Sequence, residues 1–250
     1  MRTRTVALAT ALGTVLLVPG ALAPEAATAP GRHGDAEARS APGNAPDGAV
    51  TAAQLLAAVR GCTTQVSRGR YRTDASAPRA TVPVCAGPGE VHWEADMDID
   101  CDGRPGPHCN RRTDPHFLAQ TAFSQSDGRY LSAEELPFVV VPAPGPRWRY
   151  ADHGVRGGSA AAVVYQDRVL YGVVGDVGPA EVIGEASHAA AEALGIPSDP
   201  RTGGAPSQVT YIVFTGTRVQ PIESHRAAVV EGEQRAGALV ARRAAAAAPR

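Results

Sequence analysis

The chain contains no lysine: all 24 of its basic residues are arginine, and 25 acidic residues balance them to a net charge of −1. This balance gives no indication of nucleic-acid binding. Aromatic residues make up only 5% of the chain, and outside the N-terminus no apolar run is long enough to span a membrane. We therefore expect a globular domain whose 250 residues form one sizeable core, with neither a nucleic-acid partner nor a membrane partner after processing.

The N-terminus has the three parts of a secretory signal peptide. Arg2 and Arg4 form a positively charged start, residues 6–18 are apolar, and a small-x-small site ends at Ala23. We predict a signal peptide over residues 1–23 and a secreted, extracellular mature protein.

Composition divides the rest of the chain into three parts. Residues 24–48 are rich in Ala, Pro, Gly and charge, which predicts a disordered linker. Residues 49–220 should form the main folded domain, and residues 221–250 a helical C-terminal tail. No repeat of 20 to 50 residues is present, and we expect a monomer.

Export to an oxidising compartment predicts that the even number of cysteines forms two disulfides. The four residues are Cys62, Cys85, Cys101 and Cys109. They allow three connectivities. We favour Cys101–Cys109, which closes a short Gly/Pro-rich loop, and therefore Cys62–Cys85. No C-x-x-C spacing occurs, so a zinc site is not indicated.

Predicted strands outnumber predicted helices and follow one another closely, which is typical of an α+β fold. We expect a mostly antiparallel or mixed sheet that could close into a barrel, with a few flanking helices. Helices are predicted over residues 50–60, 185–194 and about 222–240, and strands over 91–102, 138–141, 161–165, 169–174 and 209–214.

The predicted strand 91–102 alternates strictly between apolar and acidic residues. One face carries Trp93, Ala95, Met97, Ile99 and Cys101, and the other carries Glu94, Asp96, Asp98, Asp100 and Asp102. Five carboxylates on one face repel one another unless positive charge lies opposite. The row could be a solvated edge strand, half of a calcium loop, or a cleft that binds a polycation.

The calcium interpretation rests on the pattern Asp98-x-Asp100-x-Asp102-Gly103, which matches the first half of a calcium-binding loop. Cys109 stands where the closing bidentate glutamate should be. We therefore predict no metal site and no cofactor, and keep Asp96, Asp98 and Asp100 as candidate substrate-binding residues.

Asp176 and Glu185 form a second acidic constellation. Asp176 follows an apolar strand in the loop Gly175–Pro179, and Glu185 is expected in the first turn of the next helix. Rigid elements with open tips commonly carry catalytic groups. From spacing alone, a turn-capping aspartate and a first-turn glutamate explain these positions better.

Six blocks of sequence, taken together, favour a catalytic role for this pair over the two structural roles. They are ADMDIDCDG, DPHFLAQTAF, ELPFVVVP, GSAAAVVYQDRVLYGVVGDVGP, IGEASHAAAEALGI and VTYIVFTG. In order, over residues 91–216, they resemble the fungal-type chitosanases of glycoside hydrolase family 75. The resemblance implies an endo-acting, inverting chitosanase that cuts β-1,4 bonds of chitosan. It also implies that Asp176 and Glu185 are the catalytic carboxylates.

An inverting hydrolase needs one protonated and one ionised carboxyl group. A helix N-terminus favours the ionised form, which argues for Glu185 as base and Asp176 as acid. Two alternatives stay open: a non-catalytic module that binds cationic glycans or calcium, and a metal-dependent hydrolase that uses the acidic strand.

Other side chains are weaker candidates for the site. Trp93 and Tyr171 could stack on sugar rings, although an apolar-face tryptophan is more often in a core. His188 is expected at the surface, and Ser187 lacks the G-x-S-x-G setting of a serine hydrolase.

Overall fold

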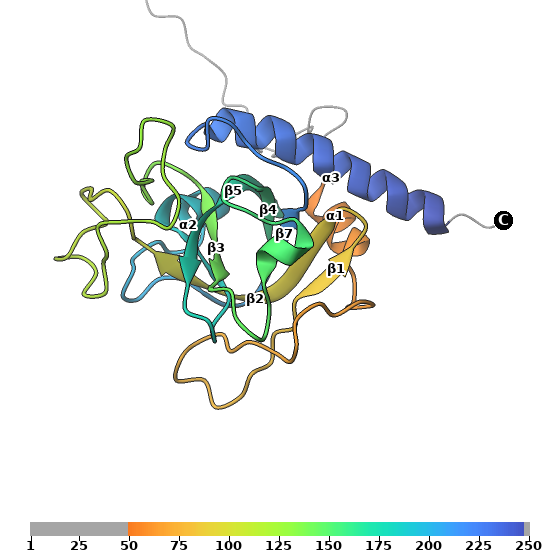
Figure 1. The fold of residues 1–250 in the computed structure, drawn as a ribbon, viewed down its shortest axis with the longest axis horizontal. Helices are drawn as coiled ribbons and strands as arrows, with labels where there is room; N and C mark the ends of the chain where they lie inside the picture. The colour runs from red at the N-terminus through yellow and green to blue at the C-terminus, as the bar shows by residue number, and fades with distance from the viewer. Residues whose placement is uncertain (1–49, 248–250) are drawn as a thin grey trace, which may run out of the picture. The chain divides into compact units, whose positions relative to one another are not determined.

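The computed structural model describes residues 50–247, so the predicted signal peptide 1–23 and linker 24–48 lie outside the described residues. The elements are arranged as Figure 1 shows. In chain order they are α1 (Ala52–Ala58), β1 (Cys85–Gly87), β2 (Glu90–Asp100), β3 (Phe138–Pro142), the 3-10 helix Tyr150–His153, β4 (Ala160–Tyr165), β5 (Arg168–Gly178), β6 (Glu185–Ser187), α2 (His188–Leu194), β7 (Ala205–Phe214) and α3 (His225–Ala247).

Six of the strands close into a barrel. The order is β2-β6-β3-β5-β4-β7, and β7 pairs with β2 again to complete the ring, while β1 is added at one end of β2. The β2–β6 and β3–β5 pairs are parallel and the other pairs are antiparallel. The predicted α+β class and mixed, barrel-like sheet are therefore confirmed.

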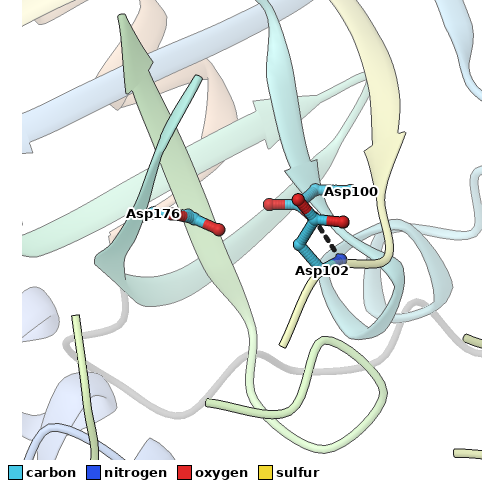
Figure 2. A group of neighbouring side chains, drawn as sticks. All are labelled: Asp100, Asp102 and Asp176. Atoms are coloured by element: carbon cyan, nitrogen blue, oxygen red, sulfur yellow. Dashed lines mark hydrogen bonds between the residues drawn. The ribbon is translucent and has the colours of Figure 1, made fainter. Parts of the chain in front are cut away.

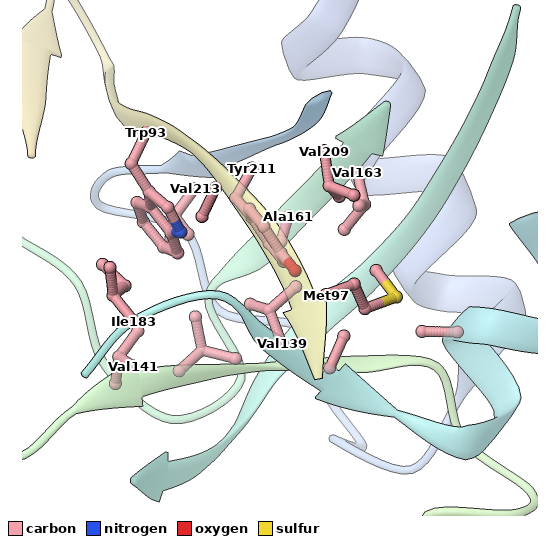
Figure 3. Packing of buried hydrophobic residues seen from close by; sticks show 14 of the residues in the cluster. Trp93, Met97, Val139, Val141, Ala161, Val163, Ile183, Val209, Tyr211 and Val213 are labelled. Carbon is pink, nitrogen blue, oxygen red and sulfur yellow. The ribbon is translucent and has the colours of Figure 1, made fainter. Parts of the chain in front are cut away.

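Alternate residues of the strands fill the barrel interior with apolar side chains, as the period of two requires. Figure 3 shows Trp93 and Met97 of β2 packed among valines of β3, β4 and β7. Trp93 stacks on Tyr211 with ring centroids 5.3 Å apart. Trp93 is 1% exposed, so it belongs to the core and is not available to stack on a sugar.

Helices α1 and α3 cover part of the outer face of the barrel. Leu55 of α1 and Leu239 of α3 are buried in a second cluster with outward residues of β4, β5 and β7. Tyr171 of β5 packs against Gly232, where a Cβ would collide with its ring, so Tyr171 is also a packing residue. Helix α3 begins three residues later and ends seven residues later than predicted. Among residues 50–247, none of the helices is long and apolar enough to cross a bilayer.

Both favoured disulfides are present. Cys62–Cys85 joins the segment after α1 to β1, with Cα atoms 5.3 Å apart. Cys101–Cys109 follows directly on the last residue of β2, with Cα atoms 4.9 Å apart. The second bridge therefore anchors the loop that continues the acidic strand.

Two expectations about the acidic pair are wrong. Strand β5 continues through Asp176, so Asp176 is not in a loop after the strand. Glu185 starts the short strand β6, not a helix, because helix α2 begins only at His188. Ser187 caps this helix by accepting a hydrogen bond from the N–H of Ala190, at 3.2 Å. His188 is also buried, at 4% exposure, where a surface position was expected.

Candidate active site

A bulge in β5 decides where Asp176 points. Val174 lies opposite Val139 of β3, but the next residue of β3, Val140, lies opposite Asp176, so Gly175 is the extra residue. Val139 and Val174 face the interior of the barrel, whereas Val140 packs on the outside. The bulge therefore brings the buried Asp176 to the outer face, although strict alternation would place it inside.

Strand β6, on the other side of β3 from β5, brings Glu185 to the same outer face. Glu185 is the register partner of Asp98 on the parallel strand β2. The next residue, Ala186, lies opposite Val139 on β3 and packs in the interior, so Glu185 points outward. Continuing the antiparallel register by one residue places Glu185 beside Val140.

Asp176 and Glu185 thus stand on the two strands that flank β3, level with Val140. Two strand spacings separate their backbones by about 10 Å. Oε2 of Glu185 lies over Gly178 of β5, because a Cβ there would be only 3.0 Å from that oxygen and 3.1 Å from Val140. The two carboxylates line one cavity of about 340 Å³, hereafter the central pocket.

A second cavity of about 360 Å³, hereafter the acidic pocket, adjoins the central pocket. The two share Asp100, Asp102 and Glu185 in their linings. Besides these three, the acidic pocket is lined by Asp74, Asp98, Asp114, His116 and Arg201, with small and apolar residues between them. Together the pockets form a strongly anionic groove on the outer face of the barrel, across β2, β6, β3 and β5.

Three carboxylates in this groove lie close together. One carboxylate oxygen from each of Asp100, Asp102 and Asp176 lies within 4.8 Å of the others. Figure 2 shows Asp176 pointing toward Asp100 and Asp102. Each carboxylate also accepts backbone N–H groups: Asp100 from Asp102 at 2.6 Å, Asp102 from Leu118 at 2.7 Å, and Asp176 from Ala122 and Val177 at 2.7 Å each.

Burial and mutual repulsion raise the pKa values in the groove. Burial, with the charges of Asp98, Asp102 and Asp176 nearby, raises the pKa of Glu185 to about 8. Burial also raises the pKa of Asp176, but the two N–H groups that its carboxylate accepts oppose that shift. Burial and the neighbouring Glu185 raise the pKa of Asp100 well above its usual range. The groove therefore holds a glutamate that keeps its proton at neutral pH beside an aspartate whose rise in pKa is opposed by two backbone hydrogen bonds.

The structure separates the three candidate substrate-binding residues. Asp98 and Asp100 line the acidic pocket, as expected of groups that contact a ligand. Asp96 does not line it: its side chain lies against Gly184, and burial, followed by the charge of Asp98, raises its pKa to about 7.

Sequence reasoning did not keep Asp102 of the acidic row as a candidate, and it missed two further carboxylates of this site. Asp114 belongs to one of the quoted blocks but nothing in that block marked it as a site residue, and Asp74 lies in a loop that carried no signal. Both reach the pocket only through the folding of loops that are distant in sequence.

The aspartate cluster offers oxygen ligands of the kind that hard cations prefer. Its members are not those of the calcium pattern, because Asp176 takes the place of Asp98 beside Asp100 and Asp102. Calcium takes six to eight oxygen ligands. Within residues 50–247, this cluster supplies three carboxylates, each already bonded to a backbone N–H.

Comparison with known proteins places these residues in a family. Residues 97–236 match the family described as fungal chitosanase of glycosyl hydrolase group 75. The chain is 32% identical over 142 residues to an endo-chitosanase of Aspergillus oryzae, covering 52% of this chain and 58% of that protein. It is 32% identical over 134 residues to an endo-chitosanase of Aspergillus fumigatus, covering 50% and 56%.

A third relative, endo-chitosanase C of Aspergillus oryzae, is 34% identical over 130 residues, which cover 50% of this chain and 31% of that protein. The chain spans about half the length of the first of these relatives and less of the third. The family match covers more than half of this chain and includes β3, β5 and β6 with both outward-facing carboxylates. The chain therefore belongs to the fungal chitosanase family of glycosyl hydrolase group 75.

Proposed function

We propose that this protein is a secreted, endo-acting chitosanase that hydrolyses β-1,4 bonds of chitosan with inversion at the anomeric carbon. The observation that carries the proposal is the placement of Asp176 and Glu185 on the two strands that flank β3, both facing one anionic groove. An open groove suits attack within a chain, and the names of the relatives agree with this activity.

The groove also suits the substrate. Chitosan carries ammonium groups near neutral pH and below, and a row of carboxylates attracts such a polycation and concentrates it at the site. Asp98 and Asp100, which line the acidic pocket, are the groups we propose as contacts to these ammonium groups.

In this mechanism Glu185 is the general acid and Asp176 the general base, the reverse of the assignment that a helix N-terminus would favour. The raised pKa of Glu185, about 8, keeps a proton available for the leaving glycosidic oxygen. The N–H groups of Ala122 and Val177 stabilise Asp176 as a carboxylate that activates water.

The spacing of the two groups supports inversion. An inverting hydrolase needs carboxyl groups about 6.5–9.5 Å apart, so that a water molecule fits between the base and the anomeric carbon. Backbones about 10 Å apart, with Oε2 of Glu185 reaching over Gly178 of β5, are compatible with such a separation. No step requires a metal ion.

The test is the loss of viscosity and the release of reducing ends from soluble chitosan, measured with the parent, Asp176→Asn and Glu185→Gln. We expect rapid viscosity loss in the parent and a fall of about 10²- to 10⁴-fold in each folded variant. Asp167→Asn, on the exposed β4–β5 turn, is the matched control. NMR of the first-formed anomer tests inversion.

A parent protein that binds chitosan without cutting it would overturn the proposal and leave a glycan-binding module. Variants that fold and retain full activity would remove Asp176 and Glu185 from the mechanism while leaving the enzyme intact.

A further inference from the structure

Ser187 is a fully buried serine at the end of β6, two residues after Glu185. Its hydroxyl accepts the N–H of Phe138 at 3.0 Å and the N–H of Ala190 at 3.2 Å, and it donates to the carbonyl of Leu136 at 2.9 Å. A serine hydroxyl has one proton and two lone pairs, so these three bonds use its whole capacity. The side chain therefore connects β6 to the start of β3 and to the first turn of α2.

Strand β6 is attached unequally to its two neighbours. On the β2 side, each of its three residues has a register partner, from Asp98 to Asp100. On the β3 side, the backbone register within the described residues consists of one pair, Val139 with Ala186. The hydroxyl of Ser187 adds two hydrogen bonds on this side. A side chain thus supplies much of the contact that a longer strand would make through its backbone.

The segment that Ser187 contacts also connects to β5, the strand that carries Asp176. The carbonyl of Pro137 accepts the N–H of Val173 on β5 at 3.4 Å, and all five residues of β3 are then paired with β5. Proline has no N–H, and Ser187 bonds the polar groups on either side of it. Residues 136–138 therefore join the strand of the proposed acid to the strand of the proposed base.

The separation of the two carboxylates depends on this connection. An inverting hydrolase needs them at a set distance, with room for a water molecule. Asp176 is held to β3 by a five-residue ladder, whereas Glu185 is held to β3 by the one register pair of β6 and by the Ser187 hydroxyl. Resting on the proposed activity, we propose that Ser187 is a positioning residue, whose hydroxyl fixes Glu185 at the distance from Asp176 that the reaction requires.

The protonation of Glu185 depends on the same position. Burial, followed by the charge of Asp98, raises the pKa of Glu185 to about 8. The titratable and charged groups that line the central and acidic pockets with Glu185 are Asp74, Asp98, Asp100, Asp102, Asp114, His116, Asp176 and Arg201. Most of them are acidic, so a Glu185 side chain that leaves this buried position should lose its proton at lower pH.

The test compares Ser187→Ala with Ser67→Ala as the matched control. Ser67 is also buried, accepts the N–H of Val84 at 3.0 Å, donates to the carbonyl of Gly69 at 2.8 Å and lines neither the central nor the acidic pocket. Both changes should lower the melting temperature by about 5 °C, because each leaves buried polar groups without a partner. Only Ser187→Ala should also lower kcat, by about tenfold, and move the alkaline limb of kcat/KM to lower pH by about half a unit or more.

The pH profile separates positioning from a loss of folded protein. At a temperature where both variants are folded, a smaller active fraction would lower the rate by the same factor at every pH. An alkaline limb of Ser187→Ala that stays where it is in the parent would therefore overturn the proposal. A limb that moves as far in Ser67→Ala would overturn it as well.

A second measurement needs no cleavage. The carboxyl group of Glu185 is followed by NMR in protein labelled with ¹³C-glutamate, and Glu185→Gln assigns its signal. We expect a lower titration midpoint in Ser187→Ala than in the parent and in Ser67→Ala, and equal midpoints would overturn the positioning role. If the midpoint moves but the parent does not cut chitosan, the proposed chitosanase activity fails and the positioning of Glu185 by Ser187 stands.

Amide exchange in the parent decides the case if Ser187→Ala does not fold. The N–H of Phe138 should exchange with solvent as slowly as the N–H groups in the middle of β3, because the buried Ser187 hydroxyl accepts it. Exchange of this N–H at the rate of an exposed loop would overturn the proposal.

Discussion

Glu185 is the direct register partner of Asp98 on the parallel strands β6 and β2, so two carboxylates lie side by side on the outer face of the barrel. After burial, the charge of Asp98 is the largest influence that raises the pKa of Glu185 to about 8. This pair connects the acidic strand seen in the sequence with the proposed proton donor.

The alkaline limb of the pH–activity profile should depend on the Asp98–Glu185 pair. A general acid must keep its proton, so kcat/KM should fall as pH rises through about 8. Asp98→Asn removes a negative charge beside Glu185, lowers the pKa of Glu185 and moves this limb to lower pH, with roughly a threefold greater loss at pH 8, relative to each protein's own maximum, than in the parent. The pH profile of kcat/KM on one glucosamine oligomer, with Asp167→Asn as the control, checks this. A limb that does not move would mean that Asp98 has no influence on the protonation of the general acid.

The acid limb should depend on Asp176. This base must be ionised, so activity should be lost as pH falls through its pKa, which burial raises and the N–H groups of Ala122 and Val177 lower. If Asp176 were the acid instead, Asp98→Asn would leave the alkaline limb of kcat/KM where it is in the parent.

Gly178→Ala should slow catalysis without unfolding the protein. The new methyl group would stand 3.0 Å from Oε2 of Glu185 and 3.1 Å from Val140, so the glutamate side chain must move. We expect kcat to fall about tenfold, since a misplacement of about 1 Å in a catalytic group is costly. Gly237→Ala, which meets nothing within 4 Å on α3, should leave kcat unchanged and raise the free energy of unfolding by about 0.5–1 kcal/mol.

The two disulfides should support different properties: loss of Cys62–Cys85 should cost more stability, and loss of Cys101–Cys109 should cost more activity. Replacing Cys62 and Cys85 by serine opens a loop of 23 residues, and replacing Cys101 and Cys109 opens one of 8. The chain-entropy estimate gives losses of about 3.5 and about 2.5 kcal/mol. Only the second change frees the segment that bears Asp102, so it should cost more activity at a temperature where both variants are folded; thermal unfolding and initial rates measure the two effects.

Removal of metal ions should leave both activity and stability unchanged. Asp100, Asp102 and Asp176 each use an oxygen to accept backbone N–H groups, and the proposed proton transfers need no Lewis acid. Rates and melting temperature after treatment with EDTA, compared with protein to which calcium is restored, check this. Activity lost to EDTA and recovered with calcium would favour the metal-dependent hydrolase.

Much of the fold follows from local pattern. The alternation of Trp93, Ala95 and Met97 predicts a strand with one core face, and the run 161–174 predicts the β4–β5 hairpin. These features depend on neighbours in the chain, which is why they are visible without the structure. The short strand β6 was missed because three residues that follow a glycine and end in the helix cap carry no periodicity.

By itself the sequence determined the α+β class and the acidic character of β2 and favoured the observed disulfide pairs among three connectivities, because each depends on residue type and spacing. Only the tertiary structure decided which carboxylates meet. The bulge at Gly175 turns Asp176 outward, and pairing with β2 and β3 brings Glu185 to the same face. Burial raises the pKa of both groups, and charges that come from segments distant in sequence add to the rise for Glu185, whereas backbone hydrogen bonds oppose it for Asp176.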